Sequence, residues 1–280
     1  PHGGLEVLAS KGIHIVLPRE AIDAETGVFL RTEKSVLFII PWPRYWVIGT
    51  TDTAWHENID HPVATSADID YVLDHANAVL EKPISRKDII GVYAGLRPLL
   101  QPGVKEGESG ETASTKVSRE HTVTEVAPGL TSIAGGKLTT YRVMAADAVD
   151  FALGVEQTKV HPTCTERLAL VGAAGLDEVT ARSGEIARAH GWTLARVDHL
   201  LSRYGAETQE LLELIDAKPE YGQPLESAPA FLKAEVVWAV THEGALHLDD
   251  IIVHRVRLDL EHRDHGLAAA DEIAEIAAPL

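Results

Sequence analysis

Two glycines followed by a lysine, at residues 135–137, form the segment whose residue types and spacing could most directly do chemistry. A lysine at the start of a helix is electrostatically unfavourable, because the free N–H groups already make that end positive. The arrangement becomes favourable if an anion binds there, at N–H groups that glycines leave accessible. The sequence therefore predicts an anion-binding turn, with a solvated lysine after a flexible turn as the alternative. The segment is not a P-loop, since Leu138 stands where that motif needs Ser or Thr.

The residues after this turn predict a helix that ends at Gly154. Its apolar positions have the spacing of one buried face. They are Val143, Met144, Ala148, Val149, Ala152 and Leu153.

Three other side chains could take part in the same chemistry. Arg97 follows an apparent strand and precedes Pro98, which restricts its backbone to extended geometry and suits bidentate capture of a carboxylate or phosphate. A surface salt bridge is the competing interpretation, and it competes more strongly still for Arg119, beside Glu120. His14 alternates with apolar neighbours on a predicted strand, so a structural role competes with a functional one.

The elements that must position these residues can be read from the hydrophobic periodicity. Up to about residue 105 the pattern is mixed α and β, and from about 160 it is mostly helical. The predicted strands are 35–40, 45–50, 89–95, 121–126 and 130–134, with a helix over 65–81 and a polar loop over 101–114. The predicted later helices are 177–190, 195–204, 207–217, 230–241, 248–260 and 267–277.

Composition limits the function classes. The 280 residues carry a net charge of −17, which argues against a nucleic-acid or anionic-membrane surface. A single cysteine, Cys164, excludes an internal disulfide framework, and we expect it to be at least half-buried. The histidines and aspartates of residues 247–265 favour a solvated helical face, and we expect no metal site. The chain begins with Pro1 in what reads as the interior of a fold, so we expect a piece of a longer protein.

Four motifs occur in an order that resembles FAD-dependent (respiratory) glycerol-3-phosphate dehydrogenase. They are KGIHIVLPR at 11–19, IGTTD at 48–52, YAGLRPL at 93–99 and GGKLTTYR at 135–142. Residues 238–258 resemble the helical C-terminal domain of that family. The resemblance is to the C-terminal half of such an enzyme, and it covers nearly the whole chain.

The resemblance implies an α+β fold. It would comprise an antiparallel-sheet substrate-binding domain (1–105), the closing strand–helix unit of a Rossmann-like FAD domain (106–154) and an all-α C-terminal domain (155–280). It implies oxidation of glycerol 3-phosphate to dihydroxyacetone phosphate by FAD, with electrons passing to quinone or another acceptor. The acceptor and a homo-oligomeric state stay open. It also implies a cytoplasmic location, with peripheral membrane contact through an N-terminal half that is not present here.

The resemblance also implies roles for individual residues. Arg97 and Arg119 would hold the substrate phosphate, with Lys137 near both substrate and flavin. His14 would be the catalytic base. The flavin would be contacted by Gly135, Gly136, Lys137, Leu138 and Thr139.

The dinucleotide fingerprint G-x-G-x-x-G is absent from the sequence, so we expect this chain alone to hold FAD poorly and to be inactive. Two alternatives stay open at this point. One is an amine or amino-acid oxidase of the same DAO-like superfamily, and the other is a non-catalytic phosphate-binding or assembly module.

Overall fold

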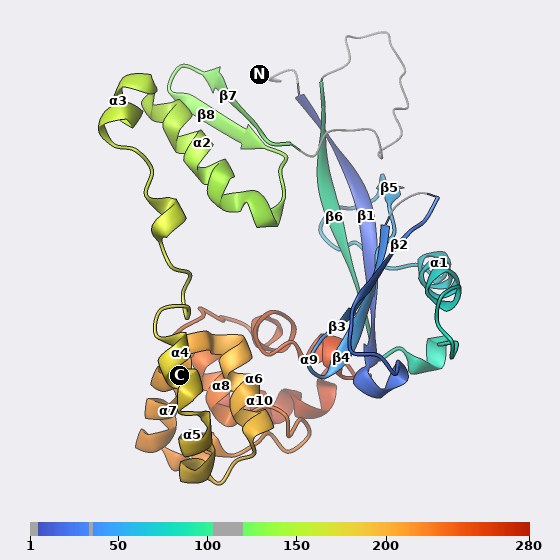
Figure 1. Ribbon diagram of the computed structural model, residues 1–280, viewed down its shortest axis with the longest axis vertical. Coiled ribbons are helices and arrows are strands. Elements are labelled where there is room, and N and C mark those ends of the chain that lie inside the picture. Colours follow the sequence, from blue (N-terminus) through green and yellow to red (C-terminus); the bar gives the residue numbers. More distant parts are fainter. Residues whose placement is uncertain (1–4, 34–35, 103–119) are drawn as a thin grey trace. The chain divides into compact units, whose positions relative to one another are not determined.

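The computed structural model describes residues 5–33, 36–102 and 120–280. The chain forms two compact units, Pro1–Leu168 and Ala169–Leu280, which are described one at a time (Figure 1). Strands are confined to the first unit apart from one isolated bridge, and the second unit is helical within the described residues. The α+β class predicted from the sequence is therefore confirmed.

A long strand, β1 (Leu5–Pro18), organises the main antiparallel sheet. The order in the described part of the chain is β2-β3-β4-β1-β5, and β6 pairs with the other edge of β1. The remaining strands are β2 (Val28–Arg31), β3 (Val36–Pro41), β4 (Tyr45–Gly49), β5 (Thr53–Trp55) and β6 (Gly91–Pro102). The expected hairpin formed by residues 35–40 and 45–50 is present as β3 and β4.

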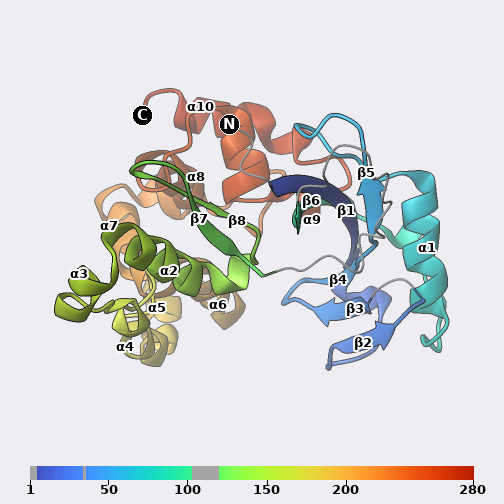
Figure 2. The ribbon, with the colours of Figure 1, turned by 90° about the horizontal axis from the view of Figure 1, so that it is seen from above.

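One face of this sheet forms a hydrophobic core with helix α1 (Ser66–Asn77), which Figure 2 shows beside it. Ile13, Ile15 and Leu17 alternate along β1 and are fully buried on that face. Thr65 caps the N-terminus of the helix, and its side chain forms a capping box with Asp68. The sequence predicts this helix over 65–81, and it ends earlier, at Asn77.

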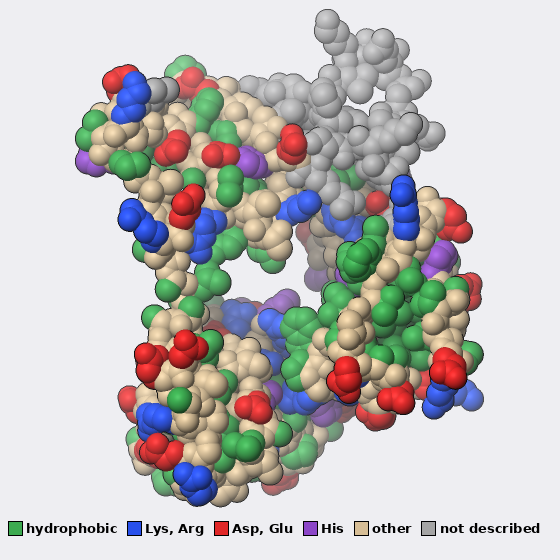
Figure 3. Space-filling model, in the orientation of Figure 1, with side chains coloured by type: hydrophobic (Ala, Val, Ile, Leu, Met, Phe, Trp, Pro, Cys, Tyr) green, Lys and Arg blue, Asp and Glu red, His purple; other side chains and the backbone are tan. Residues whose placement is uncertain are grey.

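The opposite face of β2 and β3 is apolar but exposed. Phe29 and Phe38 are cross-strand partners with ring centroids 6.3 Å apart, and they are 75% and 40% exposed. Figure 3 shows hydrophobic side chains gathered over these strands.

Strand β6 corrects one expectation. The sequence predicts a strand ending at Gly95 with Arg97 beyond it, but β6 continues through Arg97 to Pro102. It does so because β1 is long enough to pair with it from Gly91 to Pro102. β6 has no strand on its other side within the described residues, and proline is tolerated on such an edge.

A hairpin of β7 (Thr122–Ala127) and β8 (Leu130–Ala134) leads through a 3-10 turn, Leu138–Thr140, into α2 (Tyr141–Leu153). Both strands were predicted, and Gly154 caps the helix as expected. The predicted burial of one face of α2 is wrong, since no residue of this helix is buried. The reason is that a two-stranded hairpin is too small to cover the face of a 13-residue helix. α3 (Val155–Val160) follows.

The second unit packs around Trp238, which is 2% exposed, with Leu200 and Leu211. Its α-helices are α4 (Leu176–Ala181), α5 (Ser183–His190), α6 (Leu194–Tyr204), α7 (Thr208–Ala217), α8 (Lys233–Thr241), α9 (Leu258–Glu261) and α10 (Ala270–Ala277). The single helix predicted over 177–190 is two helices, α4 and α5. The helix predicted over 248–260 is a π-helix, Asp250–Arg255, followed by α9.

A buried carboxylate on α8 is hydrogen-bonded to α6 in this unit. Glu235 is fully buried and accepts hydrogen bonds from His199 Nε2 at 2.9 Å and Tyr204 OH at 3.1 Å. Burial opposes its ionisation, but the hydrogen bond and charge of His199 and the charge of Arg203 hold the pKa of Glu235 below its usual value.

Cys164 is exposed, contrary to expectation, because it lies in an irregular segment just before a short 3-10 turn. No helix in the described ranges is long and apolar enough to cross a membrane.

The core of the sheet can be tested with one substitution made at two sites. Ile15→Ala removes a fully buried side chain and should lower the free energy of unfolding by about 2–5 kcal/mol. Ile59→Ala, at a side chain that is 68% exposed, should change it by no more than about 0.5 kcal/mol. Urea denaturation followed by tryptophan fluorescence measures both values, and equal losses would contradict this description of the core.

Candidate functional site

Neighbouring strands bring the motif residues together on the face of the sheet opposite α1. His14 on β1 lies directly between Gly49 on β4 and Tyr93 on β6. Directly opposed residues point to the same face of a sheet, and the imidazole stacks on Tyr93 with centroids 5.0 Å apart and planes 13° apart. A Cβ on Gly49 would lie 2.4 Å from His14 Cδ2, so the ring fits because residue 49 has no side chain.

Arg97 reaches the same face from β6, four residues along from Tyr93. Its Nη2 donates to Thr50 Oγ1 at 2.9 Å, and its Nη1 donates to the carbonyl oxygen of Thr51 at 3.2 Å. A Cβ on Gly12 would lie 2.3 Å from Nη2 and 2.6 Å from Nη1. The guanidinium therefore lies directly over Gly12, two residues before His14 on β1.

The electrostatics of this face set the protonation state of His14. Burial disfavours the imidazolium, and the positive charge of Arg97 disfavours it further, which together lower the pKa of His14 to about 4. At neutral pH the side chain is therefore an uncharged imidazole with a nitrogen available to accept a proton.

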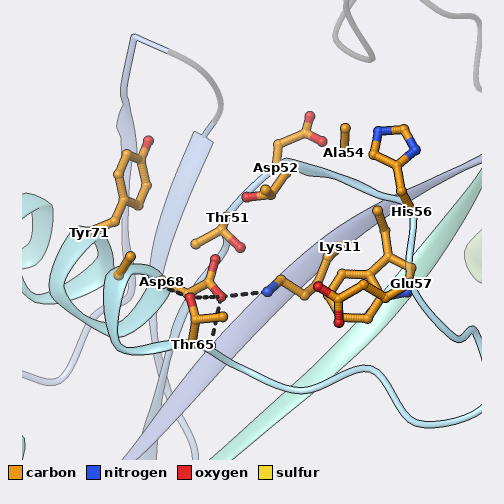
Figure 4. Close-up of a pocket in the computed structure, with 12 residues that line it drawn as sticks. Lys11, Thr51, Asp52, Ala54, His56, Glu57, Thr65, Asp68 and Tyr71 are labelled. Carbon is orange, nitrogen blue, oxygen red and sulfur yellow. Dashed lines mark hydrogen bonds and ion pairs between the residues drawn. The ribbon is translucent and has the colours of Figure 1, made fainter.

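The face toward α1 holds a different group of polar residues (Figure 4). Lys11 Nζ lies 2.7 Å from Asp68 Oδ2 and donates to the carbonyl oxygen of Val63 at 3.1 Å. Both side chains are buried. Burial alone would raise the pKa of Asp68, but hydrogen bonds from Lys11 and Thr65 hold it below its usual value.

Lys11, Thr65 and Asp68 line a cavity of about 420 Å³. Asp52, Trp55 and Tyr71 also line it. Lys11 alternates with Gly12 along β1, so this cavity and the His14–Arg97 face lie on opposite sides of the strand. The cavity is therefore not where those two residues act.

The glycine–lysine turn lies between β8 and α2. Gly135 and Gly136 have φ of +83° and +80°, a conformation that strongly favours glycine. The sequence predicts Lys137 at the start of the α-helix. In the structure it instead precedes the 3-10 turn that leads into α2. Within the described residues, the backbone N–H groups of Leu138 and Thr139 have no hydrogen-bond acceptor. Two unpaired donors after left-handed glycines form a suitable cradle for a polar or anionic acceptor.

The predicted site residues thus fall into three groups. His14 and Arg97 lie together on one face of the sheet. Gly135, Gly136, Lys137, Leu138 and Thr139 lie together on the hairpin–helix unit. Arg119 lies outside the described residues.

Sequence reasoning gave no role to Gly12, Thr50 or Thr51, although each belongs to a motif that it singled out. In the described part of the chain, no group of three or more His, Cys, Asp or Glu side chains is placed to hold a metal ion.

Comparison with known families decides where the chain belongs. Residues 2–142 match the family model described as FAD dependent oxidoreductase, and residues 163–280 match the model for the C-terminal domain of alpha-glycerophosphate oxidase. The chain belongs to the FAD-dependent oxidoreductase family. FAD is the cofactor of that family, and the resemblance inferred from the four motifs is confirmed.

Individual relatives agree with the family models. A glycerol-3-phosphate dehydrogenase of Mycobacterium leprae is 48% identical over 278 residues, which cover 99% of this chain and 46% of that protein. Glycerol-3-phosphate dehydrogenase 2 of Mycobacterium tuberculosis H37Rv is 47% identical, and the match again covers 99% of this chain and 46% of that protein.

Among solved structures, the X-ray structure of glycerol-3-phosphate dehydrogenase from Bacillus halodurans complexed with FAD is similar with a TM-score of 0.76 at 27% identity. The match covers 98% of this chain and 54% of that one. The chain spans about half the length of these relatives.

The residues present fit part of the family's cofactor. The N–H donors of Leu138 and Thr139 and the nearby Lys137 suit the polar, electron-accepting edge of a flavin ring. The fingerprint that would hold the pyrophosphate is absent from these 280 residues.

The protonation state of His14 is directly measurable. In histidine NMR spectra of the protein, the His14 signal should titrate with a midpoint near pH 4, and it is assigned by its loss in His14→Asn. Arg97→Leu should move this midpoint upward, because it removes a positive charge that opposes protonation. A midpoint near 6.5 in the unsubstituted protein, or no upward movement in the variant, would contradict the geometry described.

Proposed function

We propose that this chain is the substrate-binding and helical part of an FAD-dependent enzyme that oxidises sn-glycerol 3-phosphate to dihydroxyacetone phosphate. Electrons would pass onward to quinone or another acceptor. The observation that carries the proposal is an uncharged histidine beside a fixed arginine on one sheet face, in a chain whose 47–48% identical relatives are named glycerol-3-phosphate dehydrogenases. Such a pair combines a proton acceptor with a phosphate-binding group.

FAD, when bound, supplies the acceptor for the hydride. His14 accepts the proton of the secondary hydroxyl, since its pKa of about 4 keeps it uncharged at neutral pH. Arg97 binds the substrate phosphate, with Arg119 as its second guanidinium and Lys137 nearby. Burial lowers the pKa of His14, and the charge of Arg97 lowers it further. A phosphate dianion at Arg97 offsets that charge, so substrate binding raises the pKa of His14 and makes it a stronger base.

The finer division of the chain belongs to this proposal. Residues 1–105 would be part of the substrate-binding domain, 106–154 the closing strand–helix unit of a Rossmann-like FAD domain, and 155–280 the helical C-terminal domain. The hairpin followed by α2 supports the second assignment. The cytoplasmic location, with peripheral membrane contact outside this chain, stays a prediction.

The phosphate-binding role of Arg97 predicts a defect in substrate affinity. In the full-length enzyme, Arg97→Ala should lower kcat/KM for glycerol 3-phosphate by about 10- to 100-fold, mainly through KM, because a charge-assisted hydrogen bond to the substrate is lost. Arg97→Lys keeps the charge and should lose less. Steady-state kinetics measure both, and an unchanged KM in Arg97→Ala would remove it from the phosphate site.

The flavin-binding role of the turn can be tested with two glycines of similar backbone conformation. In Gly136→Ala, at φ +80°, the new Cβ would lie 2.4 Å from Met144 Sδ and would disturb the donors of Leu138 and Thr139. In Gly129→Ala, at φ +77°, the Cβ would meet nothing within 4 Å. The purified full-length Gly136→Ala protein should therefore contain less FAD per chain, measured by absorbance, than Gly129→Ala. Equal FAD content would argue against contact between this turn and the flavin.

A further inference from the structure

The segment that follows β4, residues 50–52, contacts β1 and also Arg97 on β6. Thr51 is 3% exposed, and its Oγ1 accepts a hydrogen bond from the backbone N–H of Ile13 on β1 at 3.1 Å. Asp52 accepts a hydrogen bond from the hydroxyl of Ser10, also on β1. These contacts fix residues 50–52 against β1 independently of any interaction with Arg97.

On this fixed segment, two successive residues bind the two terminal nitrogens of one guanidinium. Thr50 offers its hydroxyl oxygen and Thr51 its carbonyl oxygen to Arg97. Both acceptors are neutral, so they orient the guanidinium without neutralising its charge. An arginine side chain loses considerable rotamer entropy when it is ordered, and contacts made before substrate binds reduce the cost of ordering it then.

Gly12 supplies the space that this orientation needs. A Cβ at this position would lie 2.3 Å from Nη2 of Arg97 and 2.6 Å from Thr50 Oγ1. Gly95, its direct partner on β6, differs in this respect, because a Cβ there would meet nothing within 4 Å. Of these two opposed glycines, therefore, only Gly12 lies close to the guanidinium of Arg97.

We propose that Thr50 is a positioning residue, which acts with Gly12 to hold the guanidinium of Arg97 beside His14 and facing the substrate phosphate. The phosphate part of this inference rests on the proposed function. Thr50 does not itself touch the substrate in this account. It acts through Arg97.

The test compares Thr50→Val with Thr50→Ser in the full-length enzyme. Valine is close to threonine in shape but has no acceptor, whereas serine keeps the hydroxyl. Thr50→Val should raise KM for glycerol 3-phosphate about tenfold with a smaller change in kcat, and Thr50→Ser should stay within about twofold of the unsubstituted enzyme. Equal KM values in the two variants would overturn the proposal.

A second readout does not depend on the substrate. When Arg97 is released, its charge opposes protonation of His14 less, so the NMR titration midpoint of His14 should move upward in Thr50→Val and not in Thr50→Ser. If the unsubstituted full-length enzyme does not oxidise glycerol 3-phosphate, the proposed function fails, and this titration still decides whether Thr50 holds Arg97. If the His14 midpoint in Thr50→Val is the same as in the unsubstituted protein, Thr50 does not hold Arg97.

A second pair of variants guards against misfolding of Thr50→Val. Gly12→Ala should raise KM and move the His14 midpoint in the same directions, because its Cβ displaces the guanidinium. Gly95→Ala places the same methyl group in open space across the same strand pair and should do neither. Identical behaviour of the two alanine variants would contradict the role of Gly12.

Discussion

The register of β1 against β4 and β6 is the constraint on which the candidate site depends. It sets His14 opposite both Gly49 and Tyr93, and it sets Arg97 four residues further along β6 on the same face. A slip of β1 by one residue would turn His14 toward α1 and away from Arg97. The buried Ile13, Ile15 and Leu17 oppose such a slip, because it would expose them. The hydrophobic core on one face thus fixes the chemistry on the other.

Within that register, the site works by crowding two basic groups into a partly buried space. Arg97 keeps its charge because a guanidinium is protonated at any ordinary pH, and burial together with that charge keeps His14 uncharged. The consequence is an uncharged proton acceptor next to a permanent cation. An anionic substrate group that binds the cation would relieve the repulsion. This is a physical reason for a single face to combine phosphate binding with proton removal.

Local pattern was enough to predict the β3–β4 hairpin, α1 and the strands of the second hairpin, because each has clear periodicity and turn residues. It misplaced Arg97, since Pro98 reads as the end of a strand unless the long partner β1 is known. The same kind of pattern predicts a buried face for α2, but no residue of this helix is buried in the structure. The roles of Gly12 and Thr50 arise from contacts between residues far apart in sequence, and no local pattern reveals them.

The central claim is that this sheet face belongs to a site where glycerol 3-phosphate is oxidised. Anaerobic mixing of the full-length, FAD-loaded protein with glycerol 3-phosphate, followed by flavin absorbance, tests it most directly. We predict rapid bleaching by glycerol 3-phosphate and far slower bleaching by glycerol, which lacks the phosphate that we propose Arg97 binds. A tightly bound flavin that glycerol 3-phosphate fails to bleach, or that an amino acid bleaches instead, would contradict the account.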